Sequence, residues 1–224
     1  RLGWLPASVS LRAAEGRSVW YRAPLIASDI DSPAEDTVAE VGFVHVEMDG
    51  DRPNSNPFLF TGSGGVHEGG FIWGTNDAPE LLWYAAEGRI EQIVRWSQDP
   101  AEVDEELWGR YETVTREAAD LGSNPENEQV VAERLRNARE DAPAVLPYFR
   151  FVHATRPGGA WVSEYSLGAT PPRSYLVFDR EGTARGWIRF PRPIRILDIT
   201  EDRVLGLETN EWDVESVVIY PRGR

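Results

Sequence analysis

A short turn that contains Glu-Gly recurs three times along this chain, at Ala13–Arg17, Ala85–Arg89 and Asp179–Thr183. Each copy lies between two short apolar or aromatic runs. Glycine supplies the positive φ that hairpin turns require, so run, turn and run together indicate a β-hairpin. The recurrence therefore predicts a chain built from repeated all-β units.

The spacing of the repeat indicates which all-β architecture to expect. The aromatic residue that ends the run falls at Tyr84, Phe178 and Tyr220. The second interval is 42 residues, and the first is 45 once a segment of different character, 99–147, is left out. Units of this length with four short strands are typical of β-propeller blades. We therefore predict an all-β propeller fold, with 99–147 as an insertion.

Strand patterns assign about three and a half to four blades. The predicted strands are Trp4–Leu11, Ser18–Ala23 and Val38–Val46; Pro57–Thr61, Phe71–Thr75, Glu80–Tyr84 and Arg89–Trp96; Tyr148–Ala154, Ala160–Ser166, Ser174–Phe178 and Ala184–Phe190; and Ile194–Ile199, Arg203–Thr209 and Glu215–Tyr220. The last blade lacks a fourth strand, and a ring needs about four to eight blades. We expect a fragment of a larger propeller; the alternative is a complete four-bladed protein with irregular ends.

In the insertion 99–147 apolar residues recur with the period of an α-helix, which predicts two helices joined as a hairpin. Its first apolar stripe is Val103, Leu107, Tyr111, Val114, Ala118 and Leu121. Asp99-Pro100 marks a helix start and Gly122 an end, and a second helix is expected from Asn124-Pro125 to about Ala142. Strand alternation places this hairpin at the same end of the blades as three connecting segments, Asn76–Pro79, Leu167–Pro172 and Asn210–Asp213. There it is either a lid over the channel mouth or a decoration of the fold.

Several segments resemble a known family. They are Trp161–Tyr165, Val177–Gly182, Ile196–Ile199 and Arg203–Gly206, with Gly74–Asp77 and Ile93–Arg95 before them. They resemble the C-terminal blades of six-bladed β-propeller proteins abundant in Gemmatimonadota-like bacteria, related in fold to NHL and TolB-type propellers. The resemblance covers roughly Gly69 to the C-terminus. It implies six blades in full length and an extracytoplasmic (periplasmic, secreted or lipoprotein) location, and it assigns no catalytic residue.

Composition narrows the range of partners. The chain has 23 basic and 37 acidic residues, a net charge of −14, which argues against nucleic acid and anionic membrane as partners. It has no Cys, which excludes disulfides and thiolate metal sites. No apolar run approaches the roughly 18 residues of a membrane span, while a lipid anchor upstream stays open. We expect a monomer.

Two of the three histidines are candidate ligand-binding residues. His153 lies in the predicted innermost strand of the third blade, and His67 lies near the matching region of the second. Imidazoles near a propeller axis are able to hold a metal or act as a general base. The favoured interpretation is that both are structural or surface residues. Similarly, Gly62–Gly65 is interpreted as a flexible strand connection rather than a phosphate-binding loop.

The remaining candidates carry side-chain oxygens. Asn76, Asp77 and Asn210 are predicted at one end of the blades, together with Glu211 and Asp213, and are of the type that holds Ca²⁺ in propeller hydrolases. Asn and Asp are also ordinary turn formers, which is the favoured interpretation. Glu164 lies inside an apolar run and is expected to pair with a neighbouring arginine, Arg150 or Arg173; the alternative is a functional role.

These observations favour a non-enzymatic extracytoplasmic binding or scaffold protein. It would recognise a peptide, glycan or partner protein at the channel mouth near the helical insertion, because no catalytic motif is present in the sequence. The alternative is a calcium-dependent hydrolase of the lactonase or esterase type. That alternative requires Ca²⁺ as a cofactor, held in the channel by converging Asp, Asn or Glu side chains.

Overall fold

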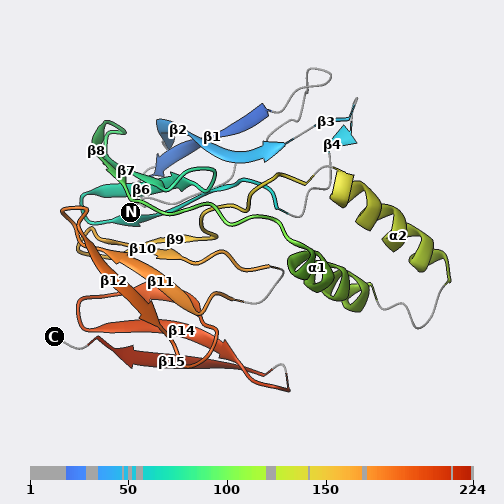
Figure 1. The fold of residues 1–224 in the computed structure, drawn as a ribbon. Coiled ribbons are helices and arrows are strands. Elements are labelled where there is room, and N and C mark those ends of the chain that lie inside the picture. The colour runs from blue at the N-terminus through green and yellow to red at the C-terminus, as the bar shows by residue number, and fades with distance from the viewer. Residues whose placement is uncertain are drawn as a thin grey trace.

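The described part of the chain is mainly antiparallel β-sheet with a helical hairpin (Figure 1). The computed structural model describes residues 19–28, 35–46, 48–49, 52–53, 58–119, 125–140, 142–167, 171–212 and 214–222. The predicted strand Trp4–Leu11 and the turn Ala13–Arg17 lie outside these residues. An all-β class is therefore confirmed for the described residues, in which the sheets do not close into a ring.

Four antiparallel sheets follow one another along the chain. The first pairs β1 (Val19–Ser28) with β2 (Glu35–Val46), and a small pair, β3 (Met48–Asp49) and β4 (Arg52–Pro53), follows it. The second sheet contains β5 (Gly62–His67), β6 (Gly70–Thr75), β7 (Glu80–Ala85) and β8 (Ile90–Arg95). The third contains β9 (Val152–Ala154), β10 (Ala160–Ser163), β11 (Ser174–Phe178) and β12 (Ala184–Arg189). The fourth has only β13 (Arg195–Ile199), β14 (Arg203–Thr209) and β15 (Glu215–Pro221).

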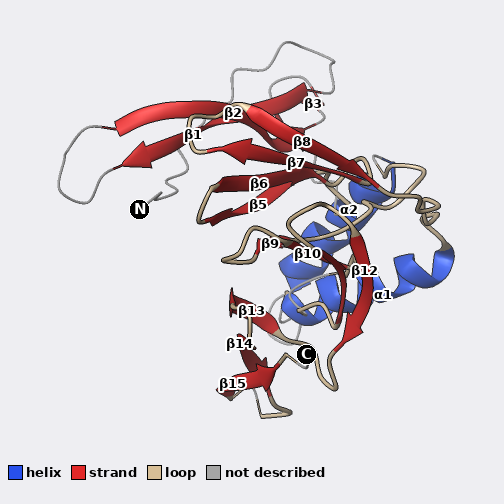
Figure 2. Ribbon diagram, turned by 90° about the vertical axis from the view of Figure 1, so that its left-hand side faces the viewer, coloured by secondary structure: helices blue, strands red, loops and turns tan. Residues whose placement is uncertain are grey.

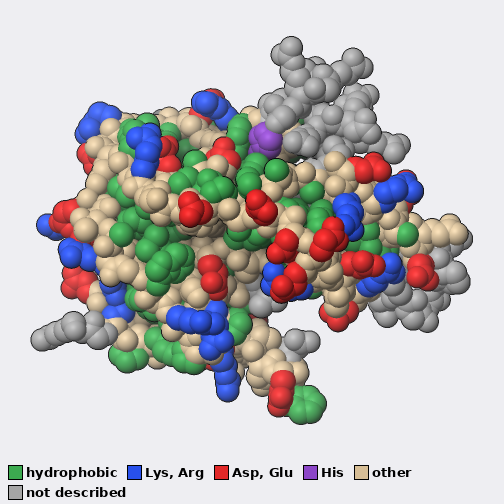
Figure 3. Space-filling view, in the orientation of Figure 1, with side chains coloured by type: hydrophobic (Ala, Val, Ile, Leu, Met, Phe, Trp, Pro, Cys, Tyr) green, Lys and Arg blue, Asp and Glu red, His purple; other side chains and the backbone are tan. Residues whose placement is uncertain are grey.

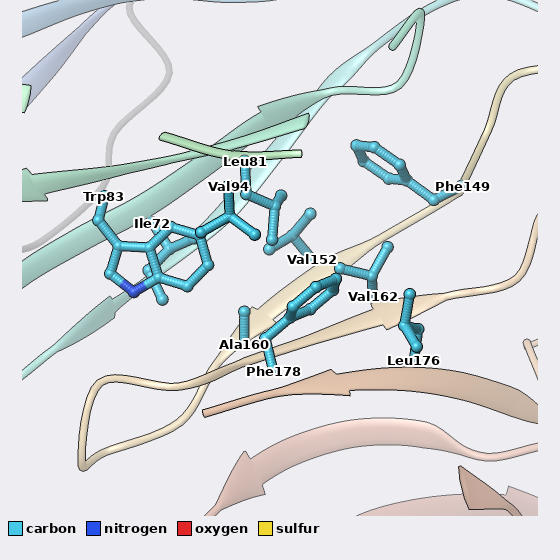
Figure 4. Packing of buried hydrophobic residues seen from close by; sticks show 10 residues of the cluster. All are labelled: Ile72, Leu81, Trp83, Val94, Phe149, Val152, Ala160, Val162, Leu176 and Phe178. Carbon is cyan, nitrogen blue, oxygen red and sulfur yellow. The ribbon is translucent and has the colours of Figure 1, made fainter. Parts of the chain in front are cut away.

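The sheets stack face to face, and the core lies between them (Figure 2). Ile72 of β6 packs toward the third sheet, in the cluster shown in Figure 4, whereas its neighbour Phe71 packs toward the first. Likewise, Val162 of β10 packs toward the second sheet and Trp161 toward the fourth. Side chains alternate across a strand, so a sheet covered on both faces needs apolar residues at every position. This explains why the strand runs in the sequence do not alternate.

The innermost strand of the second sheet was predicted wrongly. Gly62–Gly65, interpreted as a flexible connection, begins β5, and the predicted strand Pro57–Thr61 precedes it. A Cβ on Gly62 would lie 1.9 Å from the carbonyl oxygen of Gly42 in β2, and one on Gly65 would lie 2.9 Å from the amide nitrogen of Ala154 in β9. Glycine is thus required because three strands approach closely here, and not for flexibility.

The Glu-Gly turns are hairpin turns, as predicted. Gly88 and Gly182 have φ of 84° and 74°, and they join β7 to β8 and β11 to β12. Both turns lie at the end of the sheets opposite the helices, on the left of Figure 1. Each also contacts the preceding sheet. A Cβ on Gly88 would meet the Val38 carbonyl of β2, and one on Gly182 would meet Val94 of β8.

The insertion is a helical hairpin, and its first helix begins later than predicted. α1 spans Glu105–Ala118 and α2 spans Pro125–Glu140. Asp104 caps α1, since its carboxylate accepts a hydrogen bond from the Leu107 N–H at 2.8 Å. Residues 101–103 are held instead by extended pairing, with Leu146 N–H donating to the Ala101 carbonyl at 2.7 Å. Neither helix is long and apolar enough to cross a membrane.

The fourth sheet leaves an apolar face uncovered in the described structure. Leu205 of β14 pairs with Ile219 of β15, and Leu207 pairs with Val217, on the face turned away from the third sheet. Val217 and Ile219 are 67 % and 61 % exposed. By contrast, Val204 and Tyr220 point toward the third sheet and belong to the apolar cluster between the third and fourth sheets.

Candidate functional site

A broad groove lies at the helix end of the sheets, between α1 and the segment that follows β10. Its volume is about 880 Å³, and we call it the helix-side groove. It is lined by Glu106, Leu107, Gly109, Arg110, Thr113, Val114, Leu146, Glu164, Tyr165, Ser166 and Leu167. Acidic and basic side chains are interspersed over the helices, on the right of Figure 3. The groove therefore combines apolar surface with charged and hydroxyl groups.

The wall formed by α1 is held in place by aromatic packing. Trp108 and Tyr111 pack on the buried side of α1 against Phe58, with the Phe58 and Trp108 rings 5.3 Å apart. Tyr165 and Leu167 join this cluster from the loop after β10. The two helices are also tied by ion pairs, Arg139 with Glu105 and Arg116 with Glu128. One side of the groove is thus built on a packed helix rather than on a free loop.

The opposite wall carries Glu164, which is held by main-chain groups. Its carboxylate accepts hydrogen bonds from the N–H groups of Ser174, at 3.1 Å, and Arg173, at 3.4 Å. The expected charge pairing with Arg173 is not formed, because this residue contacts Glu164 only through its main-chain N–H, while its guanidinium donates to the Phe190 carbonyl at 2.7 Å. The carboxylate is partly exposed in the groove, in a fixed orientation.

Tyr165 and Ser166 place hydroxyl groups on the same wall. Burial raises the pKa of Tyr165 to about 12, although the nearby Arg150 guanidinium acts in the opposite direction, so its phenol stays protonated at neutral pH. Arg150 donates to both the carbonyl oxygen and the hydroxyl of Ser166, at 3.2 and 2.9 Å. These residues give the groove donors and acceptors in defined positions.

His153 lines a separate, smaller cavity between the third and fourth sheets. This cavity has a volume of about 200 Å³ and also contacts Arg150, Phe151, Tyr175 and Arg195. Burial lowers the pKa of His153 to about 4, so its imidazole is neutral at physiological pH. Its neighbours are aromatic rings, with Phe151 at 6.3 Å and Tyr175 at 6.0 Å.

His67 lies at the other end of the sheets and not with His153. Its Nδ1 accepts a hydrogen bond from the Gly69 N–H at 3.0 Å, and its ring lies beside Gly158. Burial lowers its pKa, opposed by Glu91 and Glu68. Within the described residues, no three His, Asp or Glu side chains form a group able to hold a metal ion.

Asn76 is a structural residue in the described fold. It is 2 % exposed, and its side-chain oxygen accepts from the Thr61 N–H at 2.6 Å. Its amide nitrogen donates to the Phe149 carbonyl at 3.0 Å and to the Thr61 hydroxyl at 3.3 Å. The side chain thus joins the ends of three segments. Asp77, next to it, is exposed.

Asn210 is a turn former, as favoured from the sequence. Its side-chain oxygen accepts hydrogen bonds from the N–H groups of Trp212 and Val214, at 2.9 and 3.0 Å, between β14 and β15. Glu211 is exposed in the same turn, and Asp213 lies outside the described residues. Asn76 and Asn210, two of the oxygen donors that the calcium alternative would use, are therefore engaged in turn and main-chain contacts.

Most residues of the helix-side groove were not singled out from the sequence. Glu164 was, but Glu106, Arg110 and Tyr165 were not. The sequence indicated only where this groove would lie, because it predicted that the helical insertion and the loop after β10 share one end of the sheets.

The comparisons with known proteins leave the family open. No protein-family model, curated protein or solved structure matches this chain. The resemblance to six-bladed propellers therefore stays a prediction.

Proposed function

We propose that this chain is a non-enzymatic binding or scaffold protein that recognises an extended peptide or glycan in the helix-side groove. The groove itself carries the proposal. It is wide and open, and it offers the fixed carboxylate of Glu164 and the phenol of Tyr165 beside apolar side chains such as Val114. Clefts with a few fixed polar groups on mainly apolar walls are typical of binding sites.

The proposed architecture is an arc of a β-propeller, six-bladed in full length. The face-to-face stacking of successive antiparallel sheets supports this, as does the position of β9 between β5 and β13. The uncovered apolar face of the fourth sheet also supports it, because a ring would pack that face against another sheet. An extracytoplasmic location forms part of the proposal and rests on the sequence resemblance alone.

The test is binding to peptide and glycan arrays by the wild type and two matched variants. Val114 in α1 is 39 % exposed and lines the groove, whereas Val130 in α2 is 64 % exposed and does not. We expect Val114→Glu to weaken binding of array ligands at least tenfold, and Val130→Glu to leave it unchanged. Equal effects of the two substitutions, or no ligand on either array, would refute the proposed site.

The same ligands test the absence of catalysis. After incubation with the protein, bound peptides or glycans should be recovered with unchanged mass. Calcium-dependent cleavage of a lactone or ester panel would instead favour the hydrolase alternative.

A further inference from the structure

Glu164 accepts both of its main-chain hydrogen bonds on the same carboxylate oxygen. The N–H groups of Arg173 and Ser174 donate to Oε1, at 3.4 and 3.1 Å. A carboxylate has two oxygens and is able to accept on each of them. Two donors on Oε1 therefore hold the side chain in one orientation and leave the acceptor capacity of Oε2 unused.

The second oxygen, Oε2, is open to the helix-side groove. Glu164 lines this groove, and within the described residues Oε2 accepts no hydrogen bond and forms no ion pair. It is also not one of the buried polar atoms that lack a partner, so solvent or a ligand reaches it. An ionised oxygen of this kind makes its strongest hydrogen bonds with cationic donors.

The two arginines nearest to Glu164 in the fold are engaged elsewhere. The guanidinium of Arg173 donates to the Phe190 carbonyl at 2.7 Å. That of Arg150 donates to the carbonyl oxygen and the hydroxyl of Ser166, at 3.2 and 2.9 Å. Neither guanidinium forms an ion pair with Glu164 in the described structure. A cation that binds Oε2 would therefore come from outside this part of the chain.

The remaining charges of the groove favour the same sign of ligand. Glu106 of α1 also lines the groove, is exposed and forms no ion pair among the described residues. Arg110 lies one turn further along α1, so the lining holds two carboxylates and one guanidinium. The whole chain carries a net charge of −14. A negative surface of this kind attracts basic partners and repels acidic ones.

We propose that the helix-side groove selects peptides that carry a lysine or arginine, whose cationic group donates to Oε2 of Glu164. This inference rests on the proposed function and narrows its ligand from a peptide or glycan to a basic peptide. Val114 and Leu146 in the lining would contact the methylene groups of the basic side chain. Because one oxygen alone is open, arginine should gain no bidentate advantage over lysine.

The test uses four synthetic peptide libraries with blocked termini. The central residue is Lys, Arg, norleucine or Glu, and the flanking positions are mixed apolar residues. Retention on the immobilised protein is measured at low salt. A hydrogen bond to a charged group is worth about tenfold or more in affinity, so the Lys and Arg libraries should be retained at least about tenfold more tightly than the norleucine library. The Glu library should be retained least.

Glu164→Gln tests the open oxygen without removing the one that is held. The amide oxygen of Gln still accepts from Arg173 and Ser174, while an NH₂ donor replaces Oε2. The urea midpoint should therefore stay unchanged, and the preference for Lys and Arg should be lost. Glu201→Gln is the matched control, because Glu201 is exposed between β13 and β14, lies outside the groove and changes the net charge equally. It should retain the preference, which separates binding at Glu164 from general attraction to an acidic protein.

Four outcomes overturn this inference. They are equal retention of the Lys and norleucine libraries, a preference that survives Glu164→Gln, a preference that Glu201→Gln also removes, and an Arg library retained far more tightly than the Lys library. The uncharged norleucine library reports on the groove itself. If its retention falls with Val114→Glu but basic residues are not preferred, the groove binds peptides and only the basic specificity fails. If no library is retained, the proposed peptide site fails as well.

Discussion

Removing the side chain of Asn76 should destabilise the protein far more than removing that of its neighbour Asp77. Asn76→Ala deletes the acceptor of the half-buried Thr61 N–H and the donor to the buried Phe149 carbonyl. An unpaired buried group costs about 1–3 kcal/mol, so two such groups predict a loss of about 2–6 kcal/mol. Asp77 is exposed, and Asp77→Ala should change stability by no more than about 0.5 kcal/mol.

Equilibrium unfolding in urea measures both losses directly. The midpoint should fall for Asn76→Ala while the slope with denaturant stays constant, because the same surface is exposed on unfolding. Asn76→Asp should also destabilise, since a carboxylate still accepts from Thr61 but cannot donate to Phe149. If Asn76→Ala and Asp77→Ala unfold within about 0.5 kcal/mol of each other, Asn76 does not hold the three segments together.

A calcium site at the same residues makes a different prediction. If Asn76 and Asp77 bound Ca²⁺, millimolar Ca²⁺ would stabilise the wild type, and Asp77→Ala would remove that gain. With Asn76 buried in main-chain contacts, we expect Ca²⁺ to leave the urea midpoint of both proteins unchanged.

Three further predictions concern glycine, histidine and the exposed sheet face. Gly182→Ala should cost at least about 1 kcal/mol more in urea unfolding than Gly186→Ala, because both have positive φ but only Gly182 abuts another side chain; equal losses would contradict this. The pKa of His153 is lower in the folded protein than in the unfolded chain. The free energy of unfolding is therefore highest above about pH 6.5, and it falls by on the order of 3 kcal/mol as the pH drops toward 4. His153→Asn should remove that part of the pH dependence, and identical profiles would disprove it. Val217→Thr with Ile219→Thr should raise solubility, measured by precipitation, with little change in unfolding midpoint; a fall in solubility would show that this face is covered in solution.

The sequence predicted the strands whose apolar side chains are packed on both faces. Runs such as Leu81–Tyr84 and Tyr175–Phe178 were placed correctly, because burial between two sheets requires continuous apolar residues. Strand β5 was missed because its glycines are needed where Gly42 and Ala154 approach it closely, and both of these residues lie far away in the sequence. Such a requirement leaves no local hydrophobic pattern.

The candidate site was predictable only in position. The shared end of the helical insertion and the loop after β10 follows from strand alternation, and Tyr165 does pack with α1 there. The fixing of Glu164 by the N–H groups of Arg173 and Ser174 depends on the geometry of one loop, which residue types alone do not determine. The separation of the two histidines was not predictable from residue types either. His67 lies beside Gly158 at one end of the sheets, whereas His153 lies beside Tyr175.

The Glu-Gly turns connect the local pattern to the stacking of the sheets. A hairpin alone would accept several residues at the position of positive φ, including Asn or Asp. At Gly182, however, a side chain would overlap Val94 of the preceding sheet, while the Glu181 carbonyl accepts a hydrogen bond from the Gln92 side chain at 2.7 Å. At Gly88 the obstacle is the Val38 carbonyl of β2. Because the same contact recurs between two successive pairs of sheets, the repeated glycine preserves the spacing of the stack as well as the turn.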